Sequence, residues 1–207
     1  MEFEPWPSIA RMTKDAIYTE KIDGTNAAVV IERVQNINYM PGNGAWPAHV
    51  DGEMYAVGAQ SRKRFITPED DNYGFACWVR DNSDALVQVL GEGRHFGEWW
   101  GSGVQKGYGM PKGSPKRFSL FNVKRWGEVL DWNKGHELIP QLFMVPVLDI
   151  STFSTEHARK LVEELRAYGS WASPGFMKPE GVVVFHTAAG VSFKTFLEND
   201  DLHKFQQ

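Results

Sequence analysis

The sequence has a single cysteine and no long hydrophobic run, and both features exclude classes of protein. Cys77 alone cannot support an internal disulfide framework or a cysteine-rich zinc site. The longest apolar runs, residues 27–31 and 182–185, fall far short of the roughly 20 residues that a membrane-spanning helix needs. The N-terminus also lacks the basic segment and apolar stretch of a secretory signal. The sequence therefore predicts a cytoplasmic protein without a disulfide scaffold.

Several common catalytic motifs are missing as well. There is no G-x-x-x-x-G-K-[ST] phosphate loop, and the glycines of residues 101–107 have the wrong spacing for a dinucleotide-binding fingerprint. The six histidines are scattered, without an H-E-x-x-H motif or a pair four residues apart. There is no G-x-S-x-G nucleophile elbow. A histidine-bound zinc site is therefore not expected, and a nucleotide must be held by other means.

Length and composition predict a globular chain. The 207 residues are enough for one domain with a sizeable core, and 42% hydrophobic and 23% charged residues are close to globular averages. Disorder, collagen-like repeats and coiled coil are not expected on this basis. The formal net charge of −4, from 22 basic and 26 acidic residues, argues against a uniformly positive surface but permits a local basic groove.

Hydrophobic periodicity predicts an α+β chain with largely antiparallel sheets, because strands and helices do not alternate regularly. The expected strands are residues 27–31, 54–59, 94–99, 118–123, 142–147, 181–185 and 191–196. The expected helices are residues 68–80, residues 84–90 and a longer helix that Ser154 caps and Gly169 ends. The polar stretch of residues 35–53 is expected to form an extended hairpin or loop.

The segment with the most chemical content is E-K-I-D-G-T-N at residues 20–26, directly before the strand of residues 27–31. A lysine in a turn next to a strand can attack phosphorus when its amine is neutral. A nearby cation or metal favours this neutral form of the amine. The glycine lets the chain turn tightly beside a ligand. Taken alone, the segment is also typical of an ordinary charged hairpin turn.

This segment resembles motif I, K-x-[DH]-G-x-N, of the covalent nucleotidyltransferases. Asn26, five positions after Lys21, is similar to the RNA-ligase branch that seals nicked duplex RNA, whereas DNA ligases usually carry arginine there. The other motifs of the superfamily follow in the same order, so the chain is identified as a member of the RNA ligase family. The resemblance implies that Lys21 is the catalytic nucleophile and that Glu20, Asp23 and Asn26 help to bind the nucleotide.

Three further segments resemble motifs that surround the nucleotide. Residues 60–70 are similar to a segment whose arginine positions phosphate or ribose, and Arg62 matches that arginine better than Arg64. F-G-E-W-W-G resembles motif III and implies that Glu98 accepts hydrogen bonds from the ribose hydroxyls. F-S-L-F-N-V resembles motif IIIa and implies that Phe121 stacks on the purine, although Asn122 replaces the usual aspartate.

The last two motifs concern the metal and the α-phosphate. P-E-G-V-V resembles motif IV and implies that Glu180 is a metal ligand, since a carboxylate is a hard oxygen donor suited to Mg²⁺ or Mn²⁺. S-F-K-T-F resembles motif V, normally K-x-K, and implies a catalytic role for Lys194. Phe196 occupies the second lysine position, so one of the usual cations on the α-phosphate is missing.

The resemblance implies an ATP-grasp-like nucleotidyltransferase fold, with two mainly antiparallel sheets and flanking helices that enclose the nucleotide. It implies that Lys21 attacks the α-phosphorus of ATP in the presence of Mg²⁺ or Mn²⁺ and forms lysyl-AMP, while Arg62 and Lys194 offset charge on the phosphoryl oxygens. AMP then passes to an RNA 5′-phosphate, which a 3′-hydroxyl seals, as in RNA repair. RNA ends or nicked duplex RNA are the expected partners. Six basic residues form either a phosphate-binding strip or solvated loop charges: Lys106, Lys112, Lys116, Arg117, Lys124 and Arg125.

Only 207 − 194 = 13 residues follow Lys194, too few for the OB-fold or helical domain that relatives carry after motif V. The sequence thus predicts a single adenylyltransferase domain over residues 1–207, which acts either as a minimal ligase or with a separate subunit that replaces the missing domain. A phage-encoded chain that acts in the host cytoplasm is an alternative source.

Three other functions compete with an RNA ligase. They are a DNA ligase catalytic domain, a GTP-using capping guanylyltransferase, and an RNA-end-binding module with a partly decayed site. Asn26 and the missing OB-fold count against the DNA ligase. Lys21, Glu98 and Glu180, which are retained together, count against the decayed site.

Overall fold

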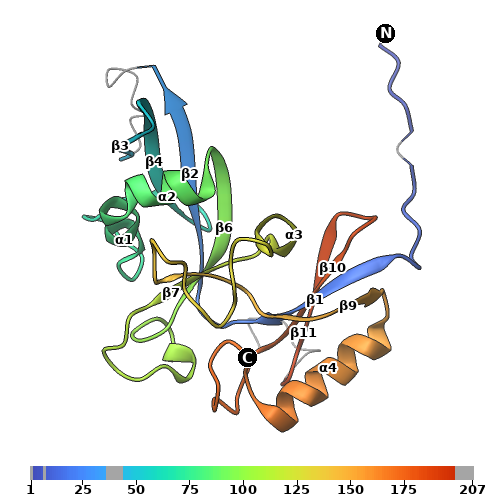
Figure 1. Ribbon diagram of the computed structural model, residues 1–207. Helices are drawn as coiled ribbons and strands as arrows, with labels where there is room; N and C mark the ends of the chain where they lie inside the picture. Colours follow the sequence, from blue (N-terminus) through green and yellow to red (C-terminus); the bar gives the residue numbers. More distant parts are fainter. Residues whose placement is uncertain (1, 7, 36–43, 199–207) are drawn as a thin grey trace. The chain divides into compact units, whose positions relative to one another are not determined.

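The computed structural model describes residues 2–6, 8–35 and 44–198, and the chain divides into two compact units (Figure 1). The terminal unit contains residues 1–21 and 146–207, and the central unit contains residues 22–145. The chain therefore passes into the central unit directly after Lys21 and leaves it before Pro146. Each unit has its own sheet.

The terminal unit is built on a four-stranded antiparallel sheet with the order β11-β10-β1-β9. Side chains alternate across a strand, so Tyr18 and Glu20 of β1 point to one face while Thr19 and Lys21 point to the other. Helix α4 covers the first of these faces, because Tyr18 belongs to a buried cluster with apolar residues of that helix. The elements of this unit are β1 (Asp15–Lys21), β9 (Val147–Thr152), α4 (Thr155–Tyr168), β10 (Gly181–His186) and β11 (Val191–Phe196).

Helix α4 begins and ends where the sequence predicts. The Ser154 hydroxyl accepts a hydrogen bond from the backbone N–H of His157 at 3.1 Å, as an N-cap does. Gly169 follows the last turn with a φ of 83°, a conformation that glycine adopts without steric strain. Both ends are therefore determined by local sequence.

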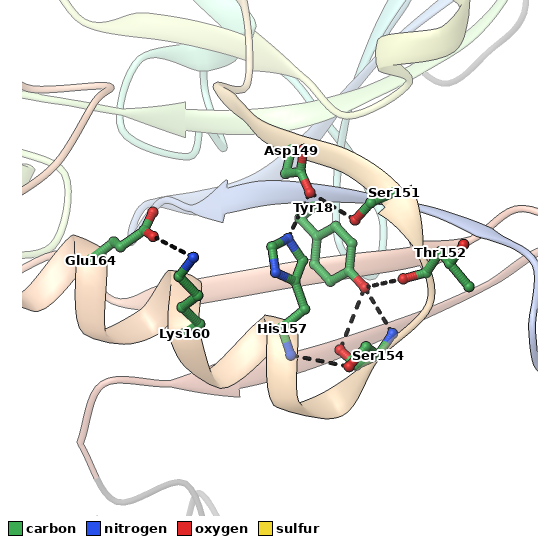
Figure 2. A network of polar contacts seen from close by, with 8 residues as sticks. All are labelled: Tyr18, Asp149, Ser151, Thr152, Ser154, His157, Lys160 and Glu164. Carbon is green, nitrogen blue, oxygen red and sulfur yellow. Dashed lines mark hydrogen bonds and ion pairs between the residues drawn. The ribbon is translucent and has the colours of Figure 1, made fainter.

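A polar network fixes the first turn of α4 to β1 and β9 (Figure 2). Asp149 Oδ2 lies 2.6 Å from Nε2 of His157 and accepts a hydrogen bond from the Ser151 hydroxyl at 2.7 Å. The Tyr18 hydroxyl accepts a hydrogen bond from the Ser154 N–H at 2.9 Å, and its ring meets the His157 ring edge-on at 4.9 Å. The hydrogen bonds from Ser151 and His157 lower the pKa of Asp149.

The central unit contains a seven-stranded sheet with the order β3-β4-β2-β6-β7-β8, in which β5 pairs with β4. All neighbouring strands are antiparallel except β7 and β8, which run parallel. The predicted α+β arrangement with two mainly antiparallel sheets is therefore confirmed. The strands are β2 (Thr25–Val34), β3 (Trp46–Val50), β4 (Glu53–Ser61), β5 (Phe65–Ile66), β6 (Gly93–Trp100), β7 (Arg117–Leu120) and β8 (Leu142–Met144).

Two helices, α1 (Phe75–Asp81) and α2 (Ser83–Leu90), pack against the sheet of the central unit (Figure 1). The Phe75 ring lies 5.4 Å from the Trp99 ring and 5.0 Å from the Phe118 ring, measured between centroids. Trp99 and Glu98 are successive residues of β6, so they point to opposite faces of the sheet. Glu98 therefore lies on the face away from α1. Two short helical segments, η2 (Gly107–Gly109) and α3 (Val123–Trp126), complete this unit.

The predicted helix at residues 68–80 is wrong in its start, because α1 begins at Phe75. Thr67 and Asp70 instead form an isolated bridge, with the Asp70 N–H donating to the Thr67 carbonyl at 3.1 Å. The carboxylate of Asp71 accepts a hydrogen bond from the Ala76 N–H at 2.7 Å and so satisfies the first turn of α1. The acceptor thus comes from a residue that the chain turn brings back to the helix.

The other predicted elements are confirmed with shifted ends. The strand expected at residues 118–123 ends at Leu120, and the one expected at residues 142–147 is divided between β8 and β9. Within the polar stretch of residues 35–53, residues 36–43 lie outside the described residues, and Trp46–Val50 forms β3. No helix in the described ranges is long and apolar enough to cross a membrane.

Candidate active site

Lys21 is the last residue of β1 and pairs with Gly181, the first residue of β10. Its Nζ lies 2.5 Å from Oε2 of Glu180, which directly precedes β10. The two side chains are 23% and 24% exposed, so each is partly accessible from solvent. The residues that the sequence assigns to the nucleophile and to the metal are therefore in direct contact.

Lys194 and Phe196 of β11 lie on the same sheet face as Lys21. Phe196 pairs with Gly181, which pairs with Lys21 on its other side, and Lys194 precedes Phe196 by two residues. The Nζ atoms of Lys21 and Lys194 lie 5.4 Å and 5.0 Å from the centroid of the Phe196 ring, within the range of cation–π contacts. The ring that replaces the second lysine of motif V thus contacts both ammonium groups.

Gly181, the glycine of motif IV, allows β10 and β11 to lie close together at this point. A Cβ on Gly181 would lie 2.9 Å from Cα of Phe196 and would collide with the Thr195 carbonyl. A strand glycine often marks such a close backbone approach. Any larger residue would move β11, and with it Phe196 and Lys194, relative to Lys21.

Glu20 points to the opposite face of β1 and is only 1% exposed. Its carboxylate accepts hydrogen bonds from the Ser170 hydroxyl at 2.5 Å, the Trp171 N–H at 2.8 Å and the Ala172 N–H at 2.9 Å. These donors belong to the loop after α4, so Glu20 ties the strand that carries Lys21 to that loop. The contacts indicate a positioning role, and the part of Glu20 in nucleotide binding stays a prediction.

In the central unit, Asn26 of β2 and Glu98 of β6 are paired residues of neighbouring strands. Glu98 Oε1 accepts a hydrogen bond from the Gly24 N–H at 3.1 Å, and Asp23 beside it is partly buried. A Cβ on Gly24 would lie 2.5 Å from the Trp99 carbonyl oxygen and 3.0 Å from Cγ of Glu98. The glycine of motif I and the glutamate of motif III therefore hold each other in place.

Arg62 is exposed in the turn between β4 and β5. Arg64, the second candidate for the same role, forms a two-point contact with Asp70: Nη1 to Oδ2 at 2.5 Å and Nη2 to Oδ1 at 2.8 Å. Within the described part of the chain, the Arg62 side chain has neither a hydrogen bond nor an ion pair. The geometry therefore favours Arg62 as the arginine that is available to a ligand.

Phe121 follows β7 and is 41% exposed, as expected for a ring that a ligand can reach. Its neighbour Asn122 caps α3, because its Oδ1 accepts a hydrogen bond from the Arg125 N–H at 3.2 Å. Asparagine and aspartate are both strong N-cap residues. Asn122 can therefore cap α3 at the position where the family usually has an aspartate.

Two of the six basic side chains considered for a phosphate-binding strip pack against aromatic rings. The Arg117 guanidinium lies 5.4 Å from the Trp100 ring and 4.6 Å from the Phe143 ring, and its burial lowers its pKa. Arg125 lies 4.6 Å from the Trp126 ring and donates to a backbone carbonyl. Of the other four, the lysines at 106, 112 and 124 are exposed and remain for a phosphate strip, and Lys116 is partly buried.

Glu180 supplies a single carboxylate for a metal ion. Across residues 2–6, 8–35 and 44–198, no three His, Cys, Asp or Glu side chains are grouped so that they could hold one. Mg²⁺ usually keeps several waters and is bound through one or two carboxylates together with substrate phosphates. Glu180 therefore fits an ion that arrives with a nucleotide better than a permanent site made of protein ligands alone.

The structure places the predicted site residues in two groups, one in each unit. Lys21, Glu180 and Lys194 lie together in the terminal unit. Asn26 and Glu98 lie together in the central unit. Three further predicted residues lie next to the ends of strands of the central unit: Asp23, Arg62 and Phe121. Sequence reasoning missed the loop of residues 170–172 that binds Glu20. A glutamate directly before Lys21 was the available signal, but its hydroxyl donor lies 150 positions away in the chain.

Both the sequence and the fold of this chain are similar to those of known proteins. The sequence model of the RNA ligase family matches residues 14–196, and a search among curated proteins finds no match. Naegleria gruberi RNA ligase with pyrophosphate is similar in structure, with a TM-score of 0.54 and 19% identity over 89% of this chain and 50% of that one. A mutant of that ligase with ATP and Mn gives a TM-score of 0.53 at 18% identity, over 90% of this chain and 50% of that one. Another mutant, with AMP and Mn, gives 0.56 at 17% identity, over 89% of this chain and 50% of that one.

These similarities differ in what they establish. The present chain spans about half the length of the solved Naegleria ligases, and at such low identity the structural likeness shows the fold alone. The family match, by contrast, runs from just before β1 to the last residue of β11 and includes every predicted site position. The chain belongs to the RNA ligase family.

Proposed function

We propose that this chain is the adenylyltransferase of an ATP-dependent RNA ligase and that Lys21 becomes covalently joined to AMP. The observation that carries the proposal is the contact between Lys21 and Glu180 on a sheet face that also carries Lys194. Attack on a phosphorus requires a nucleophile, a metal ligand and a cation that offsets developing charge, and these three side chains supply them. The Naegleria ligase has been solved with ATP, AMP and pyrophosphate, which are the substrate, transferred group and leaving group of this reaction.

In the proposed reaction, the neutral amine of Lys21 attacks the α-phosphorus of ATP. A bond forms between Nζ and phosphorus while the bond from phosphorus to the bridging oxygen breaks, and pyrophosphate leaves with the electron pair. Lys21 must therefore leave its ion pair with Glu180 and release one proton to solvent before it attacks, and its nitrogen releases a second proton as the bond to phosphorus forms. Glu180 would hold Mg²⁺ or Mn²⁺, which neutralises charge on the triphosphate when bound, and Lys194 offsets charge on the phosphoryl oxygens.

The remaining motif residues are proposed to bind the nucleotide. Glu98 would accept hydrogen bonds from the ribose hydroxyls, Phe121 would stack on the purine and Arg62 would contact phosphate. Asp23, Asn26 and Glu20 complete this set. Because the family match runs over residues 14–196 and includes all of these motif residues, we assign the chain to a single adenylyltransferase domain with the nucleotidyltransferase fold.

Transfer of label from α-labelled ATP tests the first step. The chain is incubated with ATP and Mg²⁺ or Mn²⁺, denatured, and examined for bound label and for the mass of one added AMP. We expect the wild-type chain to gain AMP and Lys21→Ala to gain none, while Lys14→Ala, at an exposed lysine just before β1, is labelled normally. Labelling of Lys21→Ala would disprove the assignment, and labelling by GTP in preference to ATP would favour a capping enzyme.

Sealing of a nicked duplex tests the later steps, in which AMP passes to a 5′-phosphate and is then displaced by a 3′-hydroxyl. RNA ends or nicked duplex RNA are the proposed substrates, so RNA should be sealed in preference to DNA of the same sequence. Preferential sealing of DNA would favour the DNA ligase alternative. Binding of RNA by a chain that ATP does not label would favour the RNA-end-binding alternative. Adenylylation without sealing would support a separate subunit for the later steps.

A further inference from the structure

One face of β6 carries exposed side chains beyond the residue assigned to ribose. Arg94, Phe96 and Glu98 are alternate residues of this strand, so all three point to the face away from α1. Phe96 is 45% exposed although it lies in the middle of a central strand, and Arg94 is also exposed. Contiguous exposed apolar side chains mark ligand or partner contacts, whereas single exposed ones need no explanation.

Phe121 enlarges this exposed surface. Its N–H donates to the Phe96 carbonyl at 3.0 Å, and the residues next to them, Gly97 and Leu120, are paired, so Phe96 and Phe121 are cross-strand neighbours on one face. Within the described residues, neither ring packs against another aromatic ring. We refer to Arg94 and Phe96 as the β6 platform, which adjoins Phe121, the ring proposed to stack on the purine of ATP.

The charge on the β6 platform is available to a ligand. In the described part of the chain, the Arg94 side chain makes neither a hydrogen bond nor an ion pair, whereas Arg33 of β2 is bound to Glu53 at 2.5 Å. On the neighbouring strand β2, Val30 pairs with Arg94 and Ala28 pairs with Phe96, and neither of these two side chains is polar. A guanidinium that makes no ion pair, beside an exposed ring, is suited to an anion that carries a flat apolar group.

A strand of nucleic acid has this chemistry. Alternate strand residues are separated by about 6.6 Å, a distance that a base stacked on one side chain and a phosphate on the next can span. Arg94 would contact the phosphate, and Phe96 would stack on the base. A duplex hides the faces of its bases inside the helix, so only an unpaired nucleotide can stack in this way.

We infer that the β6 platform binds an unpaired segment of the RNA substrate, with a base stacked on Phe96 and its phosphate on Arg94. The inference rests on the proposed function, since RNA is the substrate of that reaction. It assigns this segment to the same sheet face as Glu98, so the RNA would continue along β6 from the position proposed for the nucleotide.

Fluorescence anisotropy with a labelled, 5′-phosphorylated single-stranded RNA tests the inference. Phe96→Leu should weaken binding by about 5- to 100-fold, because a stacked aromatic ring is lost, and Phe96→Tyr should bind within about twofold of wild type. Arg94→Gln should weaken binding and reduce the slope of log affinity against log salt by about 0.7, the value for one phosphate on a single strand. The matched controls are Tyr168→Leu, at a ring that is 80% exposed, and Arg80→Gln in α1; both should bind RNA like wild type.

Thermal unfolding of each variant separates a loss of binding from a loss of structure, and Arg94→Gln keeps the test valid if Phe96→Leu is unstable. Labelling of the wild-type chain by ATP reports on the proposed function independently. An unlabelled wild-type chain would contradict the proposed function. A labelled chain whose RNA affinity is unchanged in folded Phe96→Leu and Arg94→Gln would overturn this inference alone.

Discussion

Lys21 and Phe196 face each other across Gly181, with Nζ of Lys21 5.4 Å from the centroid of the Phe196 ring. Lys194 Nζ lies 5.0 Å from the same centroid. Because Phe196 occupies the position of the second lysine of motif V, an aromatic ring here replaces a positive charge beside the proposed nucleophile. The ring attracts both ammonium groups through its negative face but cannot offset charge on a phosphate as a lysine does.

Phe196→Lys should therefore accelerate adenylylation. A third ammonium on this face would stabilise the negative charge of the reacting phosphate, and we expect a single-turnover rate at least about tenfold above wild type at saturating ATP. Ser192→Lys is the matched control, since Ser192 lies on the same face of β11 but at the far end of the strand. An unchanged or slower rate for Phe196→Lys would show that the ring position does not face the triphosphate.

Gly24→Ala should impair both stability and nucleotide binding. The added Cβ would lie 2.5 Å from the Trp99 carbonyl oxygen and 3.0 Å from Cγ of Glu98, so the hydrogen bond between Gly24 and Glu98 would be disturbed. Overpacking of this kind costs about 1–3 kcal/mol of unfolding free energy. Urea unfolding and ATP affinity measure the two effects. Gly58→Ala is the control, because its Cβ would make only ordinary contact with the Phe65 ring at 3.5 Å.

Glu20→Ala should destabilise the chain because it leaves the Ser170 hydroxyl and two backbone N–H groups without their buried acceptor. Hydrogen bonds to a charged group contribute about 1.5–3 kcal/mol each, so a loss of at least about 3 kcal/mol in unfolding free energy is expected. Glu20→Gln keeps one acceptor oxygen and should lose less. Glu164→Gln, on the exposed side of α4, should have little effect. Wild-type stability in Glu20→Ala would rule out the positioning role.

The free energy of unfolding should fall as the pH is lowered below about 6.5, the ordinary pKa of a histidine side chain. His95 is 2% exposed, and its burial lowers its pKa, while its Nε2 lies 3.0 Å from the Gly91 carbonyl. The folded-state pKa is below the unfolded one, so the unfolded chain takes up the proton first as the pH falls. The contribution of His95 is therefore complete above the unfolded pKa and is lost as the pH falls toward the folded pKa.

Urea unfolding between pH 7.5 and 5.5 measures this dependence. His95→Gln should flatten it, and His49→Gln, at an exposed histidine, should retain it. The lowered pKa of Asp149 affects stability at a lower pH than His95 does. Its contribution to the free energy of unfolding is lost only as the pH falls through the ordinary pKa of a carboxyl group and below. A His95→Gln chain with the wild-type pH dependence would contradict the assignment to His95.

The sequence by itself determined the features that depend on neighbouring residues. Ser154 and Gly169 bound α4 because capping involves groups within a few positions of each other. Alternation along β1 and β11 determined that Lys21, Lys194 and Phe196 could share sheet faces once the strands paired. The order of the motifs was sufficient to indicate the family, which the match over residues 14–196 confirms.

Only the tertiary structure decided which distant groups meet. The Thr67 segment has the composition of a helix start, yet Asp71 caps α1 because the chain turn brings its carboxylate to the helix. The contact of Lys21 with Glu180 and the burial of Glu20 beneath the loop of residues 170–172 both arise from strand pairing and helix packing. Hydrogen bonds and ion pairs act over a few ångströms in space, and periodicity along a chain carries no information on which remote residues come within that distance.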